Sequence, residues 1–369
     1  MLPRIRLNRR LVLLLGALLL ILFAAACSKG AQSTFDPKGP VARDQNDLFL
    51  LIFWLAVGVF ILVEGLLVYS IIRFRRKKGD DTLPKQVHGN SKLEVFWTLI
   101  PLAIVVVIAI PTYTTIADQH SPPDGESVKV EVVGHQWWWE FRYPELGIAT
   151  ANELNVPTGK VIKIDMLSGD VVHSFWIPKL AGATDVFPNR LTQMWFIADD
   201  VGTYYGQCKE LCGVEHALMR MRVVARTPTD FDTWAASQKS PPPAPAPGSL
   251  AAQGQQVFAT HGCLLCHTTS GPEAPGTQEG REKGYESGQS VFPGPNLTYF
   301  ATRDSFAGSV RDRTEDNLRE WLTDPDAVKP GNHMAQLAPA YQNPDLKLSK
   351  QDIDALIAYL MSRTPAPSQ

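Results

Sequence analysis

Cysteine is scarce in this chain, with only five among 369 residues, and its placement leaves none for a disulfide framework. Two cysteines fall in residues 208–212 and two in residues 263–266, where both pairs belong to motifs that indicate other chemistry. The fifth, Cys27, stands alone at the end of an apolar run. If both motifs operate, no pair remains for a structural disulfide.

An excess of charge of either sign is also missing. The 35 basic and 37 acidic side chains give a formal net charge of −2, but they are segregated along the chain. One dense basic run lies between two long apolar runs and consists of Arg73, Arg75, Arg76, Lys77 and Lys78. Short positive loops of membrane proteins stay in the cytoplasm. The run therefore indicates topology, and nothing in the sequence points to nucleic-acid binding.

The two apolar runs, residues 48–72 and about 95–117, are each long enough to cross a bilayer as a helix. They predict a two-helix transmembrane hairpin within residues 28–118. Because the basic loop stays inside, residues 28–47 and everything after about residue 118 should lie on the outer face of a bacterial cell membrane. Glu64 lies within the first run, where a central charge costs roughly 2.5–3.5 kcal/mol. Such a residue usually faces a partner or a cavity, and we assign it no role.

Residues 1–27 have the layout of an export signal. A basic start is followed by an apolar stretch over residues 11–23 and by three small residues before Cys27. A cysteine at this place is typical of the lipid-modified cysteine of bacterial lipoproteins, although Ala24 stands where leucine is usual. The alternatives are ordinary signal cleavage and an uncleaved additional membrane anchor.

Residues 208–219 place two thiols, an imidazole and a thioether in one short loop: Cys208, Cys212, His216 and Met219. Soft sulfur ligands together with imidazole select copper over magnesium, calcium or manganese. A second histidine, His173, lies upstream. A blue-copper site uses one cysteine, whereas C-x-x-x-C allows both sulfurs to bridge two metal ions. A zinc site and a structural disulfide are the alternatives.

The second motif is Cys263-Leu-Leu-Cys266-His267, the C-x-x-C-H pattern of covalent haem c attachment. Two thiols add to the two haem vinyl groups, and the adjacent histidine reaches the iron. Thioredoxin-like motifs share C-x-x-C, but the following histidine and the exported context favour haem.

The copper loop resembles the dinuclear copper A loop of cytochrome c oxidase subunit II, C-x-E-x-C-x-x-x-H-x-x-M. Residues 91–101 resemble the E-x-x-W-T-x-x-P segment of the same family, and residues 134–139 carry its G-H-Q-W motif. The resemblance covers roughly residues 45–235 and implies an all-β, Greek-key, cupredoxin-like domain over residues 119–238. Alternating apolar residues predict strands at 128–133, 161–164 and 219–224.

The resemblance also implies roles for single residues. Cys208 and Cys212 would bridge two coppers, His173 and His216 would bind one copper each, Met219 would be a weak ligand of one, and the Glu210 carbonyl would bind the other. The Glu210 carboxylate would face a magnesium ion shared with subunit I. Trp137 would lie near the surface where cytochrome c delivers its electron, unless it is a core or membrane-interface aromatic. Glu94 would lie near the mouth of a proton path into subunit I, unless it is a solvated carboxylate favoured by the helix dipole. We expect His135 to be structural.

Residues 239–249 are rich in proline and predict an extended, semi-rigid linker before a haem domain at residues 250–369. The order of motifs in this domain resembles the all-α class I cytochromes c. His267 would be the proximal ligand, and Met334 in K-P-G-x-x-M would be the sixth, although Ala335 follows where proline is usual. His333 and Met361 are the competing ligands. Pro295 would fix the His267 ring through its carbonyl, and residues 270–293 read as a surface insertion.

The whole chain thus resembles subunit II of a caa-type haem–copper cytochrome c oxidase with a fused cytochrome c. The resemblance implies that an external donor (cytochrome c or a respiratory complex) reduces haem c, and that electrons pass through copper A to haem a of subunit I. There oxygen is reduced to water with proton translocation, and subunit III is a further partner. Alternatives are a copper A subunit of a nitric oxide reductase and a free-standing, membrane-tethered carrier. The helical hairpin and the Glu94 segment argue against the carrier.

Overall fold

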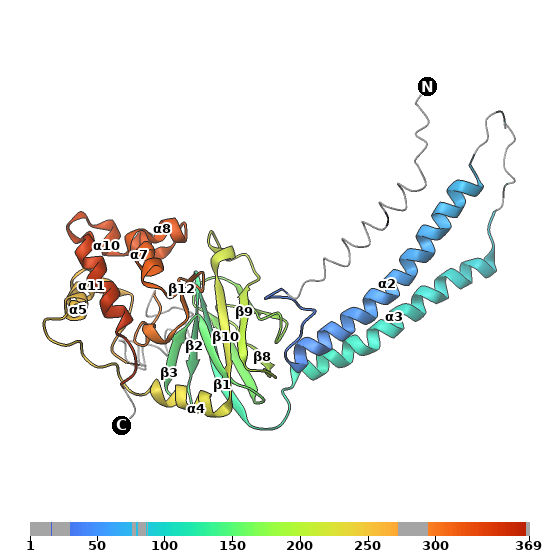
Figure 1. The fold of residues 1–369 in the computed structure, drawn as a ribbon. Coiled ribbons are helices and arrows are strands. Elements are labelled where there is room, and N and C mark those ends of the chain that lie inside the picture. The colour runs from blue at the N-terminus through green and yellow to red at the C-terminus, as the bar shows by residue number, and fades with distance from the viewer. Residues whose placement is uncertain are drawn as a thin grey trace.

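The computed structural model describes residue 16 and residues 30–75, 79, 86, 88–271 and 294–366. The predicted export signal with Cys27, part of the basic loop and most of the predicted insertion at 270–293 lie outside the described residues. Two long helices extend side by side from one end of a β domain. A small helical domain packs against the opposite side of the β domain (Figure 1). The predicted architecture of a helical hairpin, a cupredoxin-like domain and a helical cytochrome domain is confirmed.

The hairpin consists of α2 (Pro40–Arg73) and α3 (Ser91–His120), with mean hydropathies of 2.6 and 2.5 over their most apolar windows, which are unburied. A helix rises 1.5 Å per residue, so each is longer than the roughly 30 Å hydrocarbon core of a bilayer. The first turn of α2, unlike the rest of the helix, packs against the β domain. Val41 joins the core of the β domain, which explains why α2 begins at Pro40 and not near residue 48.

The segment before α2 is bonded to the β domain. The Lys38 amide donates to the Lys179 carbonyl at 2.6 Å, and the Lys38 carbonyl accepts from the Asp199 amide at 3.0 Å. Gly39 comes so close to this domain that an added Cβ would lie 2.3 Å from the Ile197 carbonyl oxygen. Arg43 forms an ion pair with Asp199. The hairpin is therefore held to the soluble part by packing as well as by chain connection.

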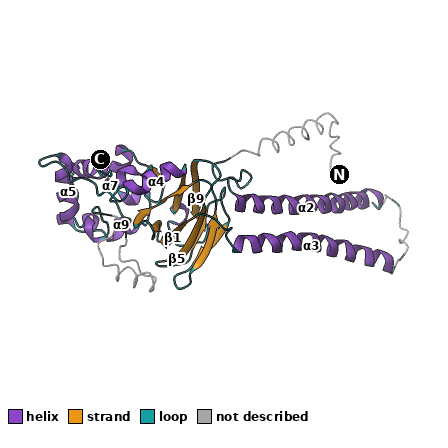
Figure 2. Cartoon of the chain, turned by 90° about the horizontal axis from the view of Figure 1, so that it is seen from below, coloured by secondary structure: helices purple, strands orange, loops and turns teal. Residues whose placement is uncertain are grey.

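The β domain is a sandwich of two five-stranded sheets (Figure 2). The first sheet has the order β3-β2-β1-β5-β8, with β1 at Ser127–His135, β2 at Trp138–Tyr143, β3 at Ile148–Ala151, β5 at Val161–Ser168 and β8 at Thr192–Phe196. The second has the order β4-β10-β9-β6-β7, with β4 at Glu153–Pro157, β6 at His173–Trp176, β7 at Ala183–Val186, β9 at Gly202–Cys208 and β10 at Arg220–Arg226. Each sheet contains one parallel pair, β1 with β5 and β4 with β10.

Alternation along the strands builds the core between the sheets. In β10 every second residue is buried, including Met221, Val223 and Ala225. Large buried aromatics such as Trp139, Phe141 and Phe175 fill the interior, and each buried side chain of this size stabilises the fold by about 1.5–3 kcal/mol. The predicted strands lie within β1, β5 and β10, except that Met219 precedes β10. Helix α4 (Pro228–Ser237) closes one end by packing Phe231 and Trp234 near Tyr143.

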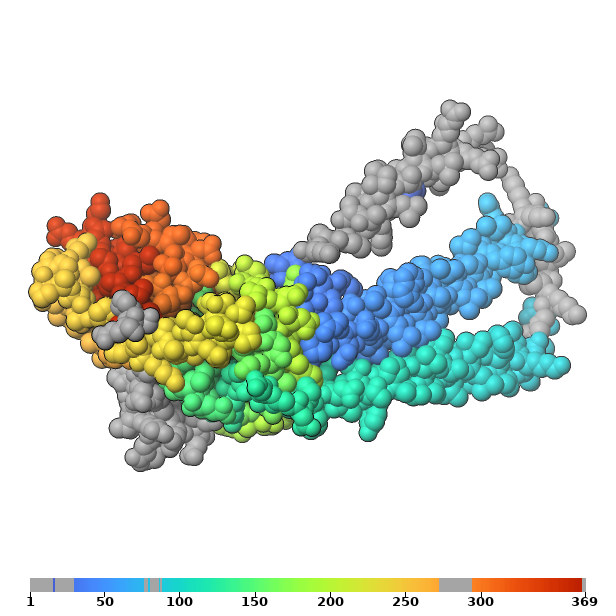
Figure 3. All heavy atoms as spheres, turned by 60° about the horizontal axis from the view of Figure 1, so that its bottom comes forward, coloured from blue at the N-terminus to red at the C-terminus, as the bar shows by residue number. Residues whose placement is uncertain are grey.

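In its described residues, the C-terminal domain is helical apart from one short strand pair, β11 (Ser305–Phe306) with β12 (Arg311–Asp312). Its described α-helices are α5 (Leu250–Thr260), α7 (Glu315–Thr323), α8 (Pro325–Val328), α9 (His333–Leu337), α10 (Pro339–Gln342) and α11 (Lys350–Met361). The first and last cross closely: a Cβ added at Gly254 would lie 1.9 Å from the Ala355 carbonyl oxygen. The face shown in Figure 3 has this domain seated directly on the β domain.

The proline-rich segment after α4 is in contact with the helical domain. The Pro243 carbonyl accepts from Arg363 at 3.3 Å, and the Gln238 carbonyl accepts from the Tyr299 hydroxyl at 2.5 Å. The segment therefore follows the surface of the domain that it introduces.

Candidate functional site

The copper loop is built by the ends of two neighbouring strands. β9 ends at Cys208, and β6 begins at His173 in the same sheet. The Cys208 amide donates to the Met219 carbonyl at 2.9 Å, which closes the loop of residues 208–219 on itself. The Lys209 amide donates to the Ser174 carbonyl at 3.0 Å and so joins the loop to β6. Backbone bonds thereby bring His173 to cysteines that are far from it in sequence.

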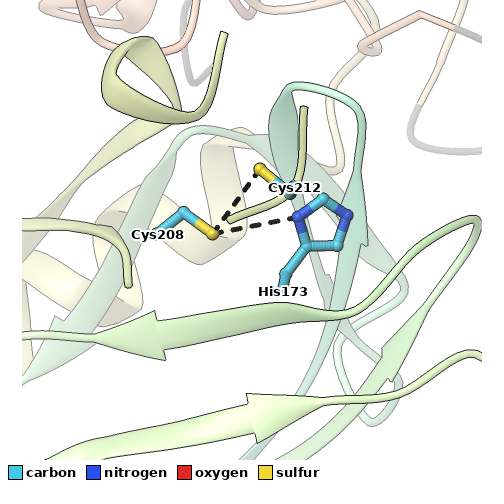
Figure 4. Close-up of side chains that lie close together, drawn as sticks. All are labelled: His173, Cys208 and Cys212. Atoms are coloured by element: carbon cyan, nitrogen blue, oxygen red, sulfur yellow. Dashed lines mark hydrogen bonds between the residues drawn. The ribbon is translucent and has the colours of Figure 1, made fainter. Parts of the chain in front are cut away.

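Four other predicted ligand groups converge around the two cysteine sulfurs. Cys208 Sγ lies 3.8 Å from Cys212 Sγ and 3.9 Å from His173 Nδ1 (Figure 4). Cys212 Sγ lies 3.7 Å from His216 Nδ1, so each sulfur has one imidazole beside it. Met219 Sδ is 3.8 Å from Cys212 Sγ, and the Glu210 carbonyl oxygen is 3.2 Å from Cys208 Sγ. The two weaker donors therefore approach different sulfurs.

The separation of the sulfurs excludes a disulfide in this structure. A disulfide bond is about 2.05 Å long, whereas these free thiols are 3.8 Å apart. His173, Cys208 and Cys212 place their ligand atoms within 4.8 Å of one another, and all three are buried. The chemistry of the donor set, two thiols with two imidazoles, fits copper.

The sulfurs are electrostatically prepared for a cation. The neighbouring Cys212 thiol lowers the pKa of Cys208 even though burial opposes the shift, and the Cys208 sulfur, together with burial, raises the pKa of Cys212. Burial lowers the pKa of His173, but its bonds to Asp170 and Cys208 outweigh burial and raise it.

Asp170 and Gln136 support the site from outside, and the sequence alone did not assign them a role. Asp170 Oδ1 lies 2.8 Å from His173 Nε2, which leaves Nδ1 directed at Cys208. Asp170 Oδ2 accepts from the Gln136 amide at 2.6 Å, and Gln136 Nε2 donates to the Cys212 carbonyl at 2.7 Å. A carboxylate on the second nitrogen of a ligating histidine fixes the ring orientation. The spacing of Asp170, three residues before His173, is the only signal that the sequence offers.

A cavity in the helical domain collects the predicted haem residues. Its lining includes Cys263, Cys266, His267 and Met334. A side chain at Gly294 would fill this space, because an added Cβ would lie 2.6 Å from His267 Cε1. His267 Nδ1 is 2.8 Å from the Pro295 carbonyl oxygen, so Nε2 remains for a metal. Burial lowers the pKa of His267 and keeps it in the neutral form that binds metals. These residues fit a covalently attached haem.

The competing sixth ligands differ in their surroundings. Met334 and His333 both line the cavity, and Met361 is absent from the lining formed by the described residues. Met361 Sδ accepts from Arg313 Nη1 at 3.7 Å. His333 packs its ring against Trp137, with centroids 4.9 Å apart. Met361 and His333 therefore each contact another side chain, whereas the Met334 sulfur has no hydrogen bond among the described residues.

The β domain forms one wall of the haem cavity. Trp137, Trp138 and Glu215 line it together with residues of the helical domain. Trp137 is 7% exposed, and its indole Nε1 donates to the Cys212 carbonyl at 3.0 Å. Lys329 Nζ lies 2.9 Å from Glu215 Oε2 and donates to the Trp137 carbonyl at 3.0 Å. The copper loop and the haem cavity are thus in contact through these side chains.

The side chains of the remaining predicted residues do not point into either site. Glu94 is exposed in the first turn of α3, where its carboxylate accepts from the Asn90 amide at 3.3 Å. Glu64 is exposed on α2. His135 stacks on Trp138 at 4.3 Å and bonds to Glu140 at 3.1 Å, which is a structural arrangement. The Glu210 side chain is exposed.

Comparison with known proteins identifies the parts of this membrane-anchored redox protein. Family models match three segments: the transmembrane domain of cytochrome c oxidase subunit II at residues 28–115, its periplasmic domain at 146–226, and cytochrome c at 251–364. Cytochrome c oxidase subunit 2 of Alkalihalophilus pseudofirmus is 37% identical over 349 residues, covering 93% of this chain and 94% of the relative. The Bacillus subtilis protein of the same name is 36% identical and covers 95% and 96%.

Among solved structures, the periplasmic domain of cytochrome oxidase subunit II from Bradyrhizobium japonicum is 31% identical, with a TM-score of 0.30, and covers 31% of this chain and 94% of that chain. The chain belongs to the cytochrome c oxidase subunit II family and carries a C-terminal cytochrome c domain. It is a redox subunit of an oxidase complex with subunit I, anchored in the membrane with its soluble domains outside. Its domains imply copper and haem c as cofactors.

Proposed function

We propose that this subunit accepts electrons at a covalently bound haem c and passes them through a dinuclear copper A centre to haem a in subunit I. Oxygen reduction to water and proton translocation take place in subunit I. The observation that carries the proposal is the contact of the two sites: Trp137 lines the haem cavity and also donates to the Cys212 carbonyl of the copper loop.

For the copper centre, we propose that Cys208 and Cys212 bridge two coppers and that His173 and His216 bind one each. The pairing of each sulfur with its own imidazole supports this assignment. Met219 and the Glu210 carbonyl are the weak ligands. Two thiolate bridges delocalise one electron over both metals, which lowers the reorganisation that accompanies transfer. The exposed Glu210 carboxylate is free to face a magnesium ion shared with subunit I.

For the haem, we propose thioether bonds to Cys263 and Cys266, with His267 and Met334 as axial ligands. The Pro295 carbonyl holds the His267 ring. Histidine–methionine ligation raises the reduction potential, which suits a carrier that feeds an oxidase.

Trp137 is the proposed connection for the electron between the two sites. Its ring lies against His333, the neighbour of Met334, and its indole reaches the carbonyl of Cys212. Because the docked haem domain leaves Trp137 only 7% exposed, an external donor reaches the haem domain and not Trp137. That donor is a cytochrome c or a respiratory complex.

Three further assignments complete the proposal. Glu94, on the cytoplasmic end of α3, would lie near the mouth of a proton path into subunit I. Cys27 follows an export signal and carries the lipid of a bacterial lipoprotein. Subunit III is a further partner in the complex.

Flash reduction of haem c in the purified complex, followed by copper absorbance, tests the proposed route. The two domains are joined and in contact, so the transfer should be intramolecular, with a rate independent of protein concentration. It should also depend weakly on salt, unlike an encounter steered by charged surfaces. A rate proportional to protein concentration would contradict the route. The haem spectrum of the same sample should show haem a beside haem c, and haem b in its place would favour a nitric oxide reductase.

A further inference from the structure

A buried ammonium group crosses the boundary between the two soluble domains. Lys329 belongs to the loop that precedes Met334 in the helical domain, and it is 4% exposed. Among the described residues, the ammonium contacts two polar groups, the Glu215 carboxylate at 2.9 Å and the Trp137 carbonyl at 3.0 Å, and both belong to the β domain. The ammonium therefore points out of its own domain and into the other one.

The Glu215 carboxylate is buried as well. Its side chain is 1% exposed, and Oε1 has no hydrogen-bond partner among the described residues. Lys329 is thus the counter-charge that the described part of the chain supplies. Removing both groups from water is costly, and their attraction offsets this only at close range and in a fixed geometry. Such a pair restricts how the two domains sit against each other.

The pair also joins the loops of the two proposed metal sites. Glu215 directly precedes His216, and Lys329 lies in the K-P-G-x-x-M loop that ends at Met334. The Trp137 carbonyl, the second acceptor of Lys329, belongs to the residue whose indole reaches Cys212. Movement of the Lys329 loop would therefore change the spacing between Met334, Trp137 and the copper loop together.

A second set of contacts crosses the same interface between the β domain and the helical domain. The buried Glu153 carboxylate of β4 accepts from the Ser305 amide and hydroxyl, each at 2.7 Å, and from the Asp304 amide at 2.9 Å. The Arg220 amide of β10 donates to the Gly308 carbonyl at 3.1 Å. These bonds hold the β11 region of the helical domain, whereas Lys329 holds its axial-ligand loop.

We infer that Lys329 is a positioning residue for electron transfer between the domains, which it serves by holding the Met334 loop against Trp137 through Glu215 and the Trp137 carbonyl. The inference rests on the proposed function, because it concerns the transfer from haem to copper. Lys329 is not expected to bind either cofactor.

The test uses the full chain in the oxidase complex and compares Lys329→Met with Lys347→Met, a substitution of an exposed lysine on the same domain. Flash reduction of haem c should show copper reduction slowed several-fold in Lys329→Met, because the rate of electron tunnelling falls steeply as the distance between the centres grows. Glu215→Gln should also slow the transfer. Lys329→Arg, which keeps the charge, should retain most of the rate, and Lys347→Met should match the unmodified protein.

Two readouts separate positioning from damage to a metal site. The haem c absorbance spectrum and the copper electron spin resonance spectrum of Lys329→Met should show that both metal sites keep their ligands. An unchanged transfer rate, or a slower rate with a lost haem ligand or an altered copper spectrum, would overturn the inference.

Hydrogen exchange of the Arg220 amide, which bonds across the interface, reports docking without any electron transfer. It should be faster in Lys329→Met than in Lys347→Met, and equal exchange in the two variants would overturn the inference. If the unmodified protein showed no intramolecular transfer while this difference in exchange remained, the proposed route would fail and the docking role of Lys329 would stand.

Discussion

The indole Nε1 of Trp137 donates to the backbone carbonyl of Cys212 at 3.0 Å, which joins a wall of the haem cavity to the copper loop by one hydrogen bond. No other tryptophan in the described residues has this contact. The bond fixes the plane of the ring between His333 and the copper loop. It gives Trp137 a geometric reason for the role proposed above.

Replacing Trp137 by leucine should slow the transfer from haem c to copper more than replacing it by phenylalanine. Both variants lose the bond to Cys212, but phenylalanine keeps an aromatic ring beside His333. Flash reduction of haem c measures both rates. Trp234→Phe is the matched control, because Trp234 packs on Tyr143 and α4 and not on either site. Equal rates in the leucine variant and in the control would remove Trp137 from the route.

Cys212→Ser should abolish the mixed-valence copper signal in electron spin resonance and leave the haem c spectrum intact. The reason is that Cys212 lies beside Cys208, His216 and Met219, whereas the haem residues occupy a separate domain. Absorbance of haem c in the same sample is the internal control. Retention of the full delocalised copper pattern would contradict a two-thiolate bridge.

Met334→Ala should remove the sixth haem ligand, lower the haem potential and allow carbon monoxide to bind the iron. Met361→Ala is the matched control and should do neither, since Met361 contacts Arg313 outside the cavity lining. Optical spectra with and without carbon monoxide decide between them. Carbon monoxide binding by the Met361 variant alone would reverse the assignment, and binding by His333→Ala alone would transfer it to His333.

Glu140 should make the β domain sensitive to acid. Burial alone would raise the pKa of Glu140, but Arg142 and His135 outweigh burial and lower it from 4.5 to about 2. A carboxylate with a lowered pKa in the folded state stabilises the fold above its unfolded pKa. This stability is lost as pH falls from near 4.5 towards about 2, and it amounts to roughly 3 kcal/mol.

Thermal unfolding of the solubilised chain, followed by tryptophan fluorescence between pH 6 and pH 3, measures this effect. Glu140→Gln should be less stable than the unmodified chain at pH 6, and the difference should shrink as the pH falls. Glu145→Gln, at an exposed position of the same β hairpin, is the matched control. A difference that stayed constant over this range would show that folding does not lower the pKa of Glu140.

Much of the architecture could be predicted because each part has a local signature. Long apolar runs predict membrane helices at any position in a chain, and C-x-x-C-H predicts haem attachment from covalent chemistry alone. The limits of α2 could not be read in this way. Its first turn packs Val41 into the core of the β domain, and the sequence shows only that residues 40–47 are less apolar than those that follow.

The candidate ligands of the copper loop were apparent because Cys208, Cys212, His216 and Met219 are close in sequence. Asp170 was not apparent, since aspartate before a strand is common and only the folded sheet brings its carboxylate to His173 Nε2 at 2.8 Å. Lys329 was visible only as the first residue of a motif. A lysine is normally expected at the surface, and its burial follows from the way in which the second domain docks.

The sequence by itself determined which residues are able to hold copper and haem, because those abilities depend on side-chain chemistry and short spacings. It also determined the membrane topology, since hydropathy and positive charge act locally. Only the tertiary structure decided how the sites face each other. The contacts of Trp137 with Cys212 and His333, and of Lys329 with Glu215, join segments more than seventy residues apart. Such contacts depend on which surfaces two folded domains bury together, and no local pattern in the chain specifies this.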